Sequence, residues 1–205
     1  MDKSFLAALF SRGLAYGAYV AGGTDEQRRR WKQVYDAATL TAGQKALLAG
    51  FSREMKVLVV SGIWCGDCVQ QCPLLAKIAE AAGGSTGLTA GGSTGLTAGG
   101  KIDLRFVDRD EHAELTEQVR INDGSRVPIA IFMAEDGAWC GTFGDRSVSR
   151  YRAMAVRQLG PSCPIGIMPP DIGEMAATLA DWVTEFERIQ LMLRLSSRLR
   201  ALHGD

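Results

Sequence analysis

The chain has 205 residues, 46% of them hydrophobic and 22% charged, which is typical of one packed domain or of one domain with additions. Lysine plus arginine and aspartate plus glutamate number 23 each, so no positive excess favours nucleic-acid binding. No apolar run approaches the roughly 20 residues that cross a bilayer, and no signal-peptide pattern follows Lys3, so we expect a cytoplasmic protein without nucleic-acid or membrane partners.

The first segment, residues 1–54, is predicted to form a helical extension. Two stretches match a capping box, in which a threonine and a glutamine three positions later satisfy free N–H groups at a helix start. These stretches are Thr24–Gln27 and Thr41–Gln44. We therefore expect one helix to begin at each of them, with Arg28–Arg30 on a solvated face.

Residues 55–159 alternate between apolar strand patterns and helical patterns, which predicts an α/β domain with a mixed sheet. Helical segments separate the first three strands, which favours parallel neighbours, and Asp136-Gly137 predicts a hairpin to the fourth. The expected strands are Lys56–Ser61, Ile102–Val107, Val127–Met133 and Ala138–Phe143, and the expected helices are 66–82, Glu111–Arg120 and Ser147–Leu159.

Two further segments complete the expected organisation. Residues 83–100 contain GGSTGLTA twice in tandem, which predicts a flexible insertion at the end of the sheet opposite Trp64–Cys68. Residues 160–205 contain a proline-rich connection and then an amphipathic helix capped at Asp171–Glu174. We expect its apolar stripe to pack on the same domain, with a homodimer contact as the alternative.

The chemically distinctive motif is Trp64-Cys65-Gly66-Asp67-Cys68, between a predicted buried strand and a helix. At a helix start, free N–H groups and the helix dipole stabilise a thiolate, which favours Cys65 as the nucleophile. Cys68, inside the first turn, is suited to resolve a mixed disulfide formed by Cys65.

A zinc site is the alternative reading of a C-x-x-C pair, but a structural site needs four ligands and the chain has no second pair. Cys72, Cys140 or Cys163 could complete such a site, and His112 and His203 are isolated in sequence. We therefore predict no metal. Cys72 is expected to be a small buried residue, and the two histidines are expected at the surface.

These residues together resemble the thioredoxin superfamily. The resemblance rests on the strand at 56–61, the Trp64–Cys68 motif, Pro73 in the following helix, Arg126-Val127-Pro128-Ile129 and Gly144, and it covers about residues 55–159. It implies a thioredoxin-like fold, with Cys65 as the attacking thiol and Cys68 as the resolving thiol.

The resemblance also implies that Pro128 is cis and faces the sulfurs, and that the Val127 backbone pairs with an extended substrate. Trp64, Gly66 and Asp67 would complete the contact surface. Two positions depart from thioredoxins proper: Val59 stands where they carry a buried aspartate, and Asp67 replaces the proline between the cysteines. A carboxylate at position 67 opposes thiolate formation.

The predicted function is a thiol–disulfide oxidoreductase that reduces protein disulfides through Cys65 and Cys68. It would need no cofactor and would draw electrons from a thiol reductase or a low-molecular-weight thiol. The alternative is a redox-inactive or redox-sensing binding module on the same scaffold, favoured by the additional helices at both ends of the chain.

Overall fold

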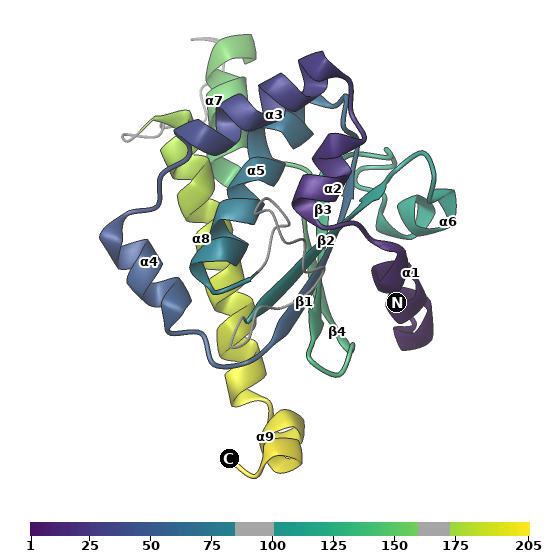
Figure 1. The fold of residues 1–205 in the computed structure, drawn as a ribbon, viewed down its shortest axis with the longest axis vertical. Helices are drawn as coiled ribbons and strands as arrows, with labels where there is room; N and C mark the ends of the chain where they lie inside the picture. The colour runs from purple at the N-terminus through teal and green to yellow at the C-terminus, as the bar shows by residue number, and fades with distance from the viewer. Residues whose placement is uncertain (85–100, 160–172) are drawn as a thin grey trace.

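A four-stranded mixed sheet organises the molecule in the computed structural model, which describes residues 1–84, 101–159 and 173–205. The strands are β1 (Met55–Ser61), β2 (Ile102–Asp108), β3 (Ile129–Ala134) and β4 (Trp139–Gly144). The helices are α1 (Lys3–Arg12), α2 (Tyr16–Ala21), α3 (Asp25–Ala37), α4 (Ala42–Ala49), α5 (Gly66–Ala81), α6 (Ala113–Thr116), α7 (Val148–Leu159), α8 (Glu174–Leu195) and α9 (Ser197–His203). The predicted α/β class with a mixed central sheet and flanking helices is confirmed (Figure 1).

The strand order is β2-β1-β3-β4, with β1 and β2 parallel and the β3–β4 hairpin antiparallel. Every residue of β3 is buried, and β1 is buried except at Lys56, because helices cover these central strands. Both strands are rich in valine, isoleucine and other apolar residues, as expected for buried strands. The sheet therefore forms the core and fixes the position of the loop that leads from β1 to the Trp64–Cys68 motif.

The expected parallel direction of the third strand is wrong, because β3 runs antiparallel to β1. Ser61 pairs with Asp108 at the end of β2, and Val60 pairs with Ile129 at the start of β3. The connection between β2 and β3 therefore stays at one end of the sheet and does not cross over. The helix expected over Glu111–Arg120 is correspondingly short, comprising α6 and a 3₁₀ turn at Glu117–Val119.

The amino-terminal helices pack against the sheet and α5. Both predicted capping boxes are confirmed, at the starts of α3 and α4. α3 lies against α5 (Figure 1), and the Trp31 indole N–H donates to the Ile63 carbonyl over 2.9 Å. Leu14 and Phe106 exchange two backbone hydrogen bonds of 2.8 Å, which joins the extension to the outer edge of β2. The extension is thus part of the packed structure and supports the loop before Trp64.

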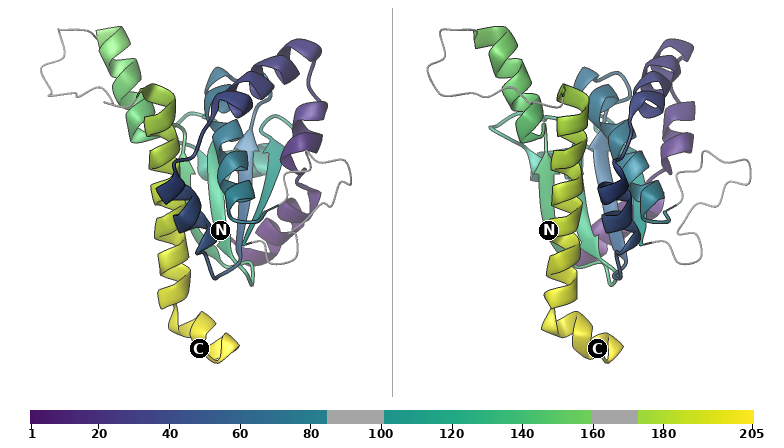
Figure 2. Two further views of the ribbon diagram at one scale, coloured as in Figure 1. Left: turned by 60° about the vertical axis from the view of Figure 1, so that its left-hand side comes forward. Right: turned by 90° about the vertical axis from the view of Figure 1, so that its left-hand side faces the viewer.

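The long helix α8 runs alongside the sheet and contacts α4, α5 and α7 (Figure 2). Most of its predicted apolar stripe is buried, namely Leu179, Trp182, Val183, Phe186, Ile189 and Leu193. Edge-to-face ring contacts join Phe186 to Phe132 of β3 and Trp182 to Phe143 of β4. This stripe is therefore occupied within the chain, and the homodimer stays a prediction.

Several expectations fall partly or wholly outside the described residues. These are the tandem repeat from residue 85 onward, the proline-rich connection with Cys163, and the cap at Asp171. The residues that flank the repeat are described: the Lys101 N–H donates to the Ala82 carbonyl over 3.0 Å. Ile102 pairs with Met55 at the start of β1, so this junction lies at the end of the sheet opposite Ser61.

Candidate active site

The two cysteines of the motif lie at the start of α5, directly after the loop that follows β1. Cys65 is the N-cap residue of α5 with an extended backbone (φ −75°, ψ 127°), and its carbonyl accepts the Val69 N–H over 3.0 Å. Cys65 is half-buried, whereas Cys68 is fully buried in the first turn. All four cysteines in the described part of the chain are free thiols. An accessible and an inaccessible thiol therefore share one helix start.

Short contacts define the surroundings of both sulfurs. The Cys65 Sγ lies 3.7 Å from the Val127 carbonyl oxygen, to which its thiol donates. The Cys68 Sγ accepts the Gly62 N–H over 3.4 Å. The peptide bond between Val127 and Pro128 is cis. The segment before β3 thus faces Cys65, and the loop after β1 closes over Cys68.

The pKa of Cys65 is raised above its ordinary value, first by the hydrogen bond that it shares with Cys68 and second by burial. The backbone N–H groups of Asp67 and Cys68 act in the opposite direction, as expected at a helix start. Burial raises the pKa of Cys68 well above that of a free thiol. Because the two thiols interact, their protons leave in two steps that belong to the pair and not to either residue alone. The raised pKa values favour the protonated form of both thiols.

Trp64 forms an exposed wall beside the thiols, with 46% of its surface accessible. The Arg109 guanidinium lies over its ring, 4.6 Å from the centroid, a cation–π arrangement. Arg109 also donates to the Ser125 carbonyl over 3.0 Å. A Cβ at Gly62 would lie 2.9 Å from the indole. The ring therefore packs closely against both Arg109 and the Gly62 backbone.

Asp67 does not present a free carboxylate to the sulfurs. It pairs with Arg146 and with Arg150, the latter at 3.1 Å, and all three side chains are mostly buried. These arginines lie just before and within α7, far from Asp67 in sequence. The expected opposition of this carboxylate to a thiolate is thus reduced by two arginines, which also pair with Asp145 and Glu174. Gly66 is exposed, and a Cβ there would meet open space.

A buried polar layer behind α5 was not foreseen from the sequence. Gln71 is fully buried: its amide donates to the Asp145 carbonyl over 2.9 Å, and its oxygen accepts the Ser147 N–H over 3.2 Å. Burial alone would raise the pKa of the Asp145 carboxyl, but hydrogen bonds from Tyr151, from its own N–H and from Arg126 hold that pKa below its ordinary value. No local pattern marks these residues, because their partners are distant in sequence.

Gly144 fits a position where no side chain could be accommodated. Its φ is +153°, and a Cβ built on it would lie 2.3 Å from the Pro128 carbonyl oxygen. Glycine is the residue that tolerates this backbone conformation and this close approach. The end of β4 thereby packs directly against the segment that faces Cys65.

The other described cysteines and the two histidines lie outside the Trp64–Cys68 motif. Cys72 is fully buried, as expected, with its Sγ 3.6 Å from the Ser61 Oγ. Cys140 is half-buried on β4 and donates to the Ala138 carbonyl over 3.4 Å. His203 is exposed and contacts Glu135, but the expected surface position of His112 is wrong, because its side chain is only 13% exposed.

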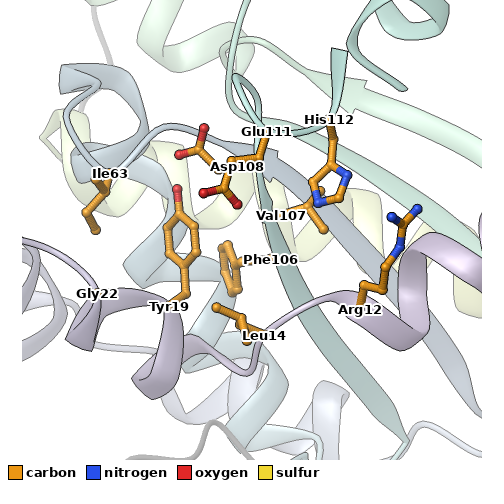
Figure 3. Close-up of a pocket in the computed structure, with 10 residues that line it drawn as sticks. All are labelled: Arg12, Leu14, Tyr19, Gly22, Ile63, Phe106, Val107, Asp108, Glu111 and His112. Atoms are coloured by element: carbon orange, nitrogen blue, oxygen red, sulfur yellow. The ribbon is translucent and has the colours of Figure 1, made fainter. Parts of the chain in front are cut away.

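His112 belongs to a pocket between the amino-terminal helices and the end of β2 (Figure 3). The pocket has a volume of about 350 Å³. Both polar and apolar residues line it, namely Arg12, Leu14, Tyr19, Gly22, Ile63, Phe106, Val107, Asp108, Glu111 and His112. Ile63 comes directly before Trp64 in the chain, so this pocket adjoins the site loop.

Among the described residues, the side chains of histidine, cysteine, aspartate and glutamate form no group of three or more that could hold a metal ion. Within the same residues, the helices all lack the combination of length and apolarity that a membrane span requires.

Comparison with protein-family models shows to which family the chain belongs. A family model described as Thioredoxin matches residues 13–85 and 97–157, which is more than half of the sequence. The chain belongs to this thioredoxin family. The match begins at Gly13 and so includes most of the amino-terminal extension.

Two solved structures have a similar fold. One is the crystal structure of a protein of unknown function from Pseudomonas aeruginosa, 16% identical, with a TM-score of 0.62 over 89% of this chain and 95% of that chain. The other is an HIV epitope scaffold, 16% identical, with a TM-score of 0.56 over 97% of this chain and 98% of that chain. A search of curated proteins found no match. These similarities concern the fold alone.

Proposed function

We propose that this thioredoxin-family chain is a thiol–disulfide oxidoreductase that reduces protein disulfides through Cys65 and Cys68. The observation that carries the proposal is the placement of a half-buried thiol at the start of α5, beside a fully buried second thiol. The helix start supplies N–H groups that favour a thiolate at Cys65. The second thiol can then act only on a partner already bound to the first.

The proposed reaction has two displacements. The Cys65 thiolate attacks one sulfur of the substrate disulfide, forms a mixed disulfide and expels the other substrate sulfur as a thiolate, which takes up a proton. The Cys68 thiolate then attacks the Cys65 Sγ, closes an intramolecular disulfide and releases the second substrate thiolate. Two electrons pass from the dithiol to the substrate. A thiol reductase or a low-molecular-weight thiol returns the protein to the dithiol, and no cofactor takes part.

The raised pKa values of the pair support the reducing direction. A dithiol whose thiolate is strongly stabilised is a strong oxidant, because its reduced form is favoured. At Cys65 the hydrogen bond with Cys68 and burial outweigh the N–H groups of the helix start, and at Cys68 burial dominates. We therefore expect the pair to pass electrons to substrates. Disulfide-containing proteins in the cytoplasm, without a role for nucleic acid or membrane, are the proposed partners.

The surface around Cys65 is proposed to bind the substrate chain. Trp64 and Gly66 are exposed beside the thiol, and Val127 and Pro128 lie across from it. An extended substrate segment can pair with the Val127 backbone and rest on the Trp64 ring. Asp67, held by its two arginines, fixes the first turn of α5 at the rim of this surface.

Insulin-disulfide reduction with dithiothreitol as the electron source tests the proposal. The Cys65→Ser variant should lose all stimulation, and the Cys68→Ser variant should accumulate mixed disulfides with its targets. Cys140→Ser is the matched control, because it removes a half-buried thiol on β4 and should keep full activity. Activity retained by Cys65→Ser contradicts the proposal. A pair that never cycles between dithiol and disulfide supports a binding module.

A further inference from the structure

We propose that Ser61, Tyr19 and Asp108 form a proton path. It leads from the buried Cys68 thiol to the pocket between the amino-terminal helices and the end of β2. This inference rests on the proposed function, in which Cys68 attacks the mixed disulfide at Cys65. The three residues act through Cys68 and are positioning residues. The pocket supplies their connection to solvent.

The path answers a physical requirement of the second displacement. Only the thiolate form of Cys68 can attack, but its side chain is fully buried. A proton that leaves this thiol therefore needs an acceptor inside the protein. The middle of β1, the strand that leads to the motif, offers no carboxylate. Its residues Val57, Leu58, Val59 and Val60 are all apolar and buried.

Ser61 is the polar residue that follows this apolar run, at the end of β1. It is fully buried, and its Oγ lies 3.6 Å from the Cys72 Sγ, one turn of α5 beyond Cys68. The hydroxyl also interacts with the Cys68 thiol itself. A serine hydroxyl both accepts and donates, so it can take a proton on one side while it gives one up on the other.

Tyr19 of α2 provides the next group. Tyr19 is only 7% exposed, and its buried hydroxyl has no hydrogen-bond partner within the described residues. Ser61 is nevertheless close enough to lower the pKa of Tyr19 against the larger effect of burial, which raises it. The hydroxyl points across the pocket towards Asp108 (Figure 3). A buried, unpartnered hydroxyl that faces a pocket is suited to hold water there.

Asp108 completes the path at the end of β2. It pairs with Ser61 in the register of the two parallel strands, and it lines the same pocket as Tyr19. One of its oxygens accepts the Asp110 N–H over 2.8 Å, which fixes the side chain. Other charged or titratable groups also face this pocket, namely Arg12, Glu111 and His112, and Cys72 lies near Tyr19.

The proposed transfer conserves protons and electrons. As Cys68 prepares to attack, its proton passes to the Ser61 hydroxyl, Ser61 passes its own proton through a bridging water to Tyr19, and Tyr19 passes one through pocket water to the Asp108 carboxylate. The resulting thiolate forms the bond to the Cys65 Sγ and displaces the substrate thiolate. Asp108 then returns its proton to solvent through the pocket.

The chromogenic disulfide dithiobis(nitrobenzoate) separates the two displacements, because each releases one coloured thiolate. The reference is the full chain with Cys140→Ala and Cys163→Ala, so that these thiols do not contribute. Attack by Cys65 gives the first phase of colour, which tests the proposed function. Attack by Cys68 gives the second phase, which tests the proton path.

Tyr19→Phe, Ser61→Ala and Asp108→Asn should each keep the first phase and slow the second at pH 7 by about 100-fold, the lower end of what a positioned base contributes. Asparagine at 108 keeps an oxygen for the Asp110 N–H but cannot accept a proton. The controls are Tyr16→Phe, which removes another buried hydroxyl of α2, and Asp110→Asn, which removes an exposed carboxylate. Both should match the reference in both phases.

The pH profile distinguishes proton transfer from a structural effect. The deficit of Asp108→Asn should shrink between pH 7 and pH 9, because hydroxide replaces the missing acceptor. A second phase at the reference rate in both Tyr19→Phe and Asp108→Asn overturns the path, as does a deficit that stays constant with pH. Absence of the first phase from the reference protein contradicts the proposed function instead.

Discussion

At the scale of single residues, the charges around the motif determine which group is free to act. Asp67 is paired with Arg146 and Arg150, so its carboxylate is not an isolated negative charge near the thiols. The N–H groups at the start of α5 remain available to Cys65. The hydrogen bond with Cys68 and burial nevertheless keep the Cys65 thiol protonated. Reactivity at this residue should therefore depend strongly on pH.

We expect the rate of Cys65 alkylation by iodoacetamide to rise about tenfold per pH unit from pH 6 to pH 8. The thiolate is the reactive form, and a pKa raised above the ordinary value places this whole range on the rising part of the titration curve. Mass spectrometry of the peptide that contains Cys65 measures the rate, with a free model thiol as the reference. A rate that levels off below pH 8 would mean that Cys65 has a lowered pKa.

The motif residues could be predicted from sequence because their geometry is local. Cys65 and Cys68 are three positions apart at a helix start, and their relative burial follows from the first turn of that helix. The partners of Asp67 could not be predicted, since Arg146 lies 79 residues further along the chain. The fold alone brings these charges together.

At the scale of secondary structure, Gln71 joins three elements at one point. It lies on α5, its side chain bonds the backbone that leads from β4 into α7, and its oxygen accepts the Trp182 indole N–H of α8 over 3.2 Å. This buried amide therefore fixes the position of α8 relative to the helix that carries both thiols.

The Gln71→Leu variant should lose about 3 kcal/mol of unfolding free energy, because it leaves buried hydrogen-bonding groups of Asp145, Ser147 and Trp182 without a partner. Urea denaturation measures the change. Gln70→Leu is the matched control, since the neighbouring glutamine is exposed and its replacement should shift stability by less than about 0.5 kcal/mol. Equal effects of the two substitutions would contradict this role of Gln71.

The helix starts at Thr24 and Thr41 were predictable because a capping box is contained within four residues. The direction of β3 was not, because the connection of residues 109–128 is long enough either to cross the sheet or to return at the same end. Burial of Leu115 and Val119 holds α6 and the 3₁₀ turn against the core, which keeps the connection at the end where it began. Such a choice is made by packing and leaves no periodic signal.

At the scale of the whole molecule, the site and the repeat junction occupy opposite ends of the sheet. Cys65, Asp108 and the start of β3 lie at one end, whereas Ala82 and Lys101 meet at the other. The hydrogen bond between the Lys101 N–H and the Ala82 carbonyl has the pattern that closes a β-turn when two residues separate the pair. Gly83 and Gly84 could serve as those two residues.

Deletion of residues 85–100, which joins Gly84 to Lys101, should leave insulin-disulfide reduction within about twofold of the intact chain, because the flanking residues Ala82 and Lys101 lie at the end of the sheet opposite the site. Turnover and thermal unfolding of the two proteins provide the comparison. Deletion of the same number of residues from the β2–β3 connection is the contrasting case and should abolish activity, since that segment leads to Val127. A large loss on deletion of 85–100 would place the repeat near the chemistry.

The backbone pairing of Leu14 with Phe106 has a consequence for solubility. An outer strand with unpaired N–H and C=O groups can recruit strands from other molecules and so begin aggregation. Leu14 occupies both of these groups at Phe106 of β2, and α1 and α2 lie directly before and after Leu14 in the chain. The amino-terminal segment thus blocks part of this edge from pairing with strands of other molecules, and it also supports the loop before Trp64.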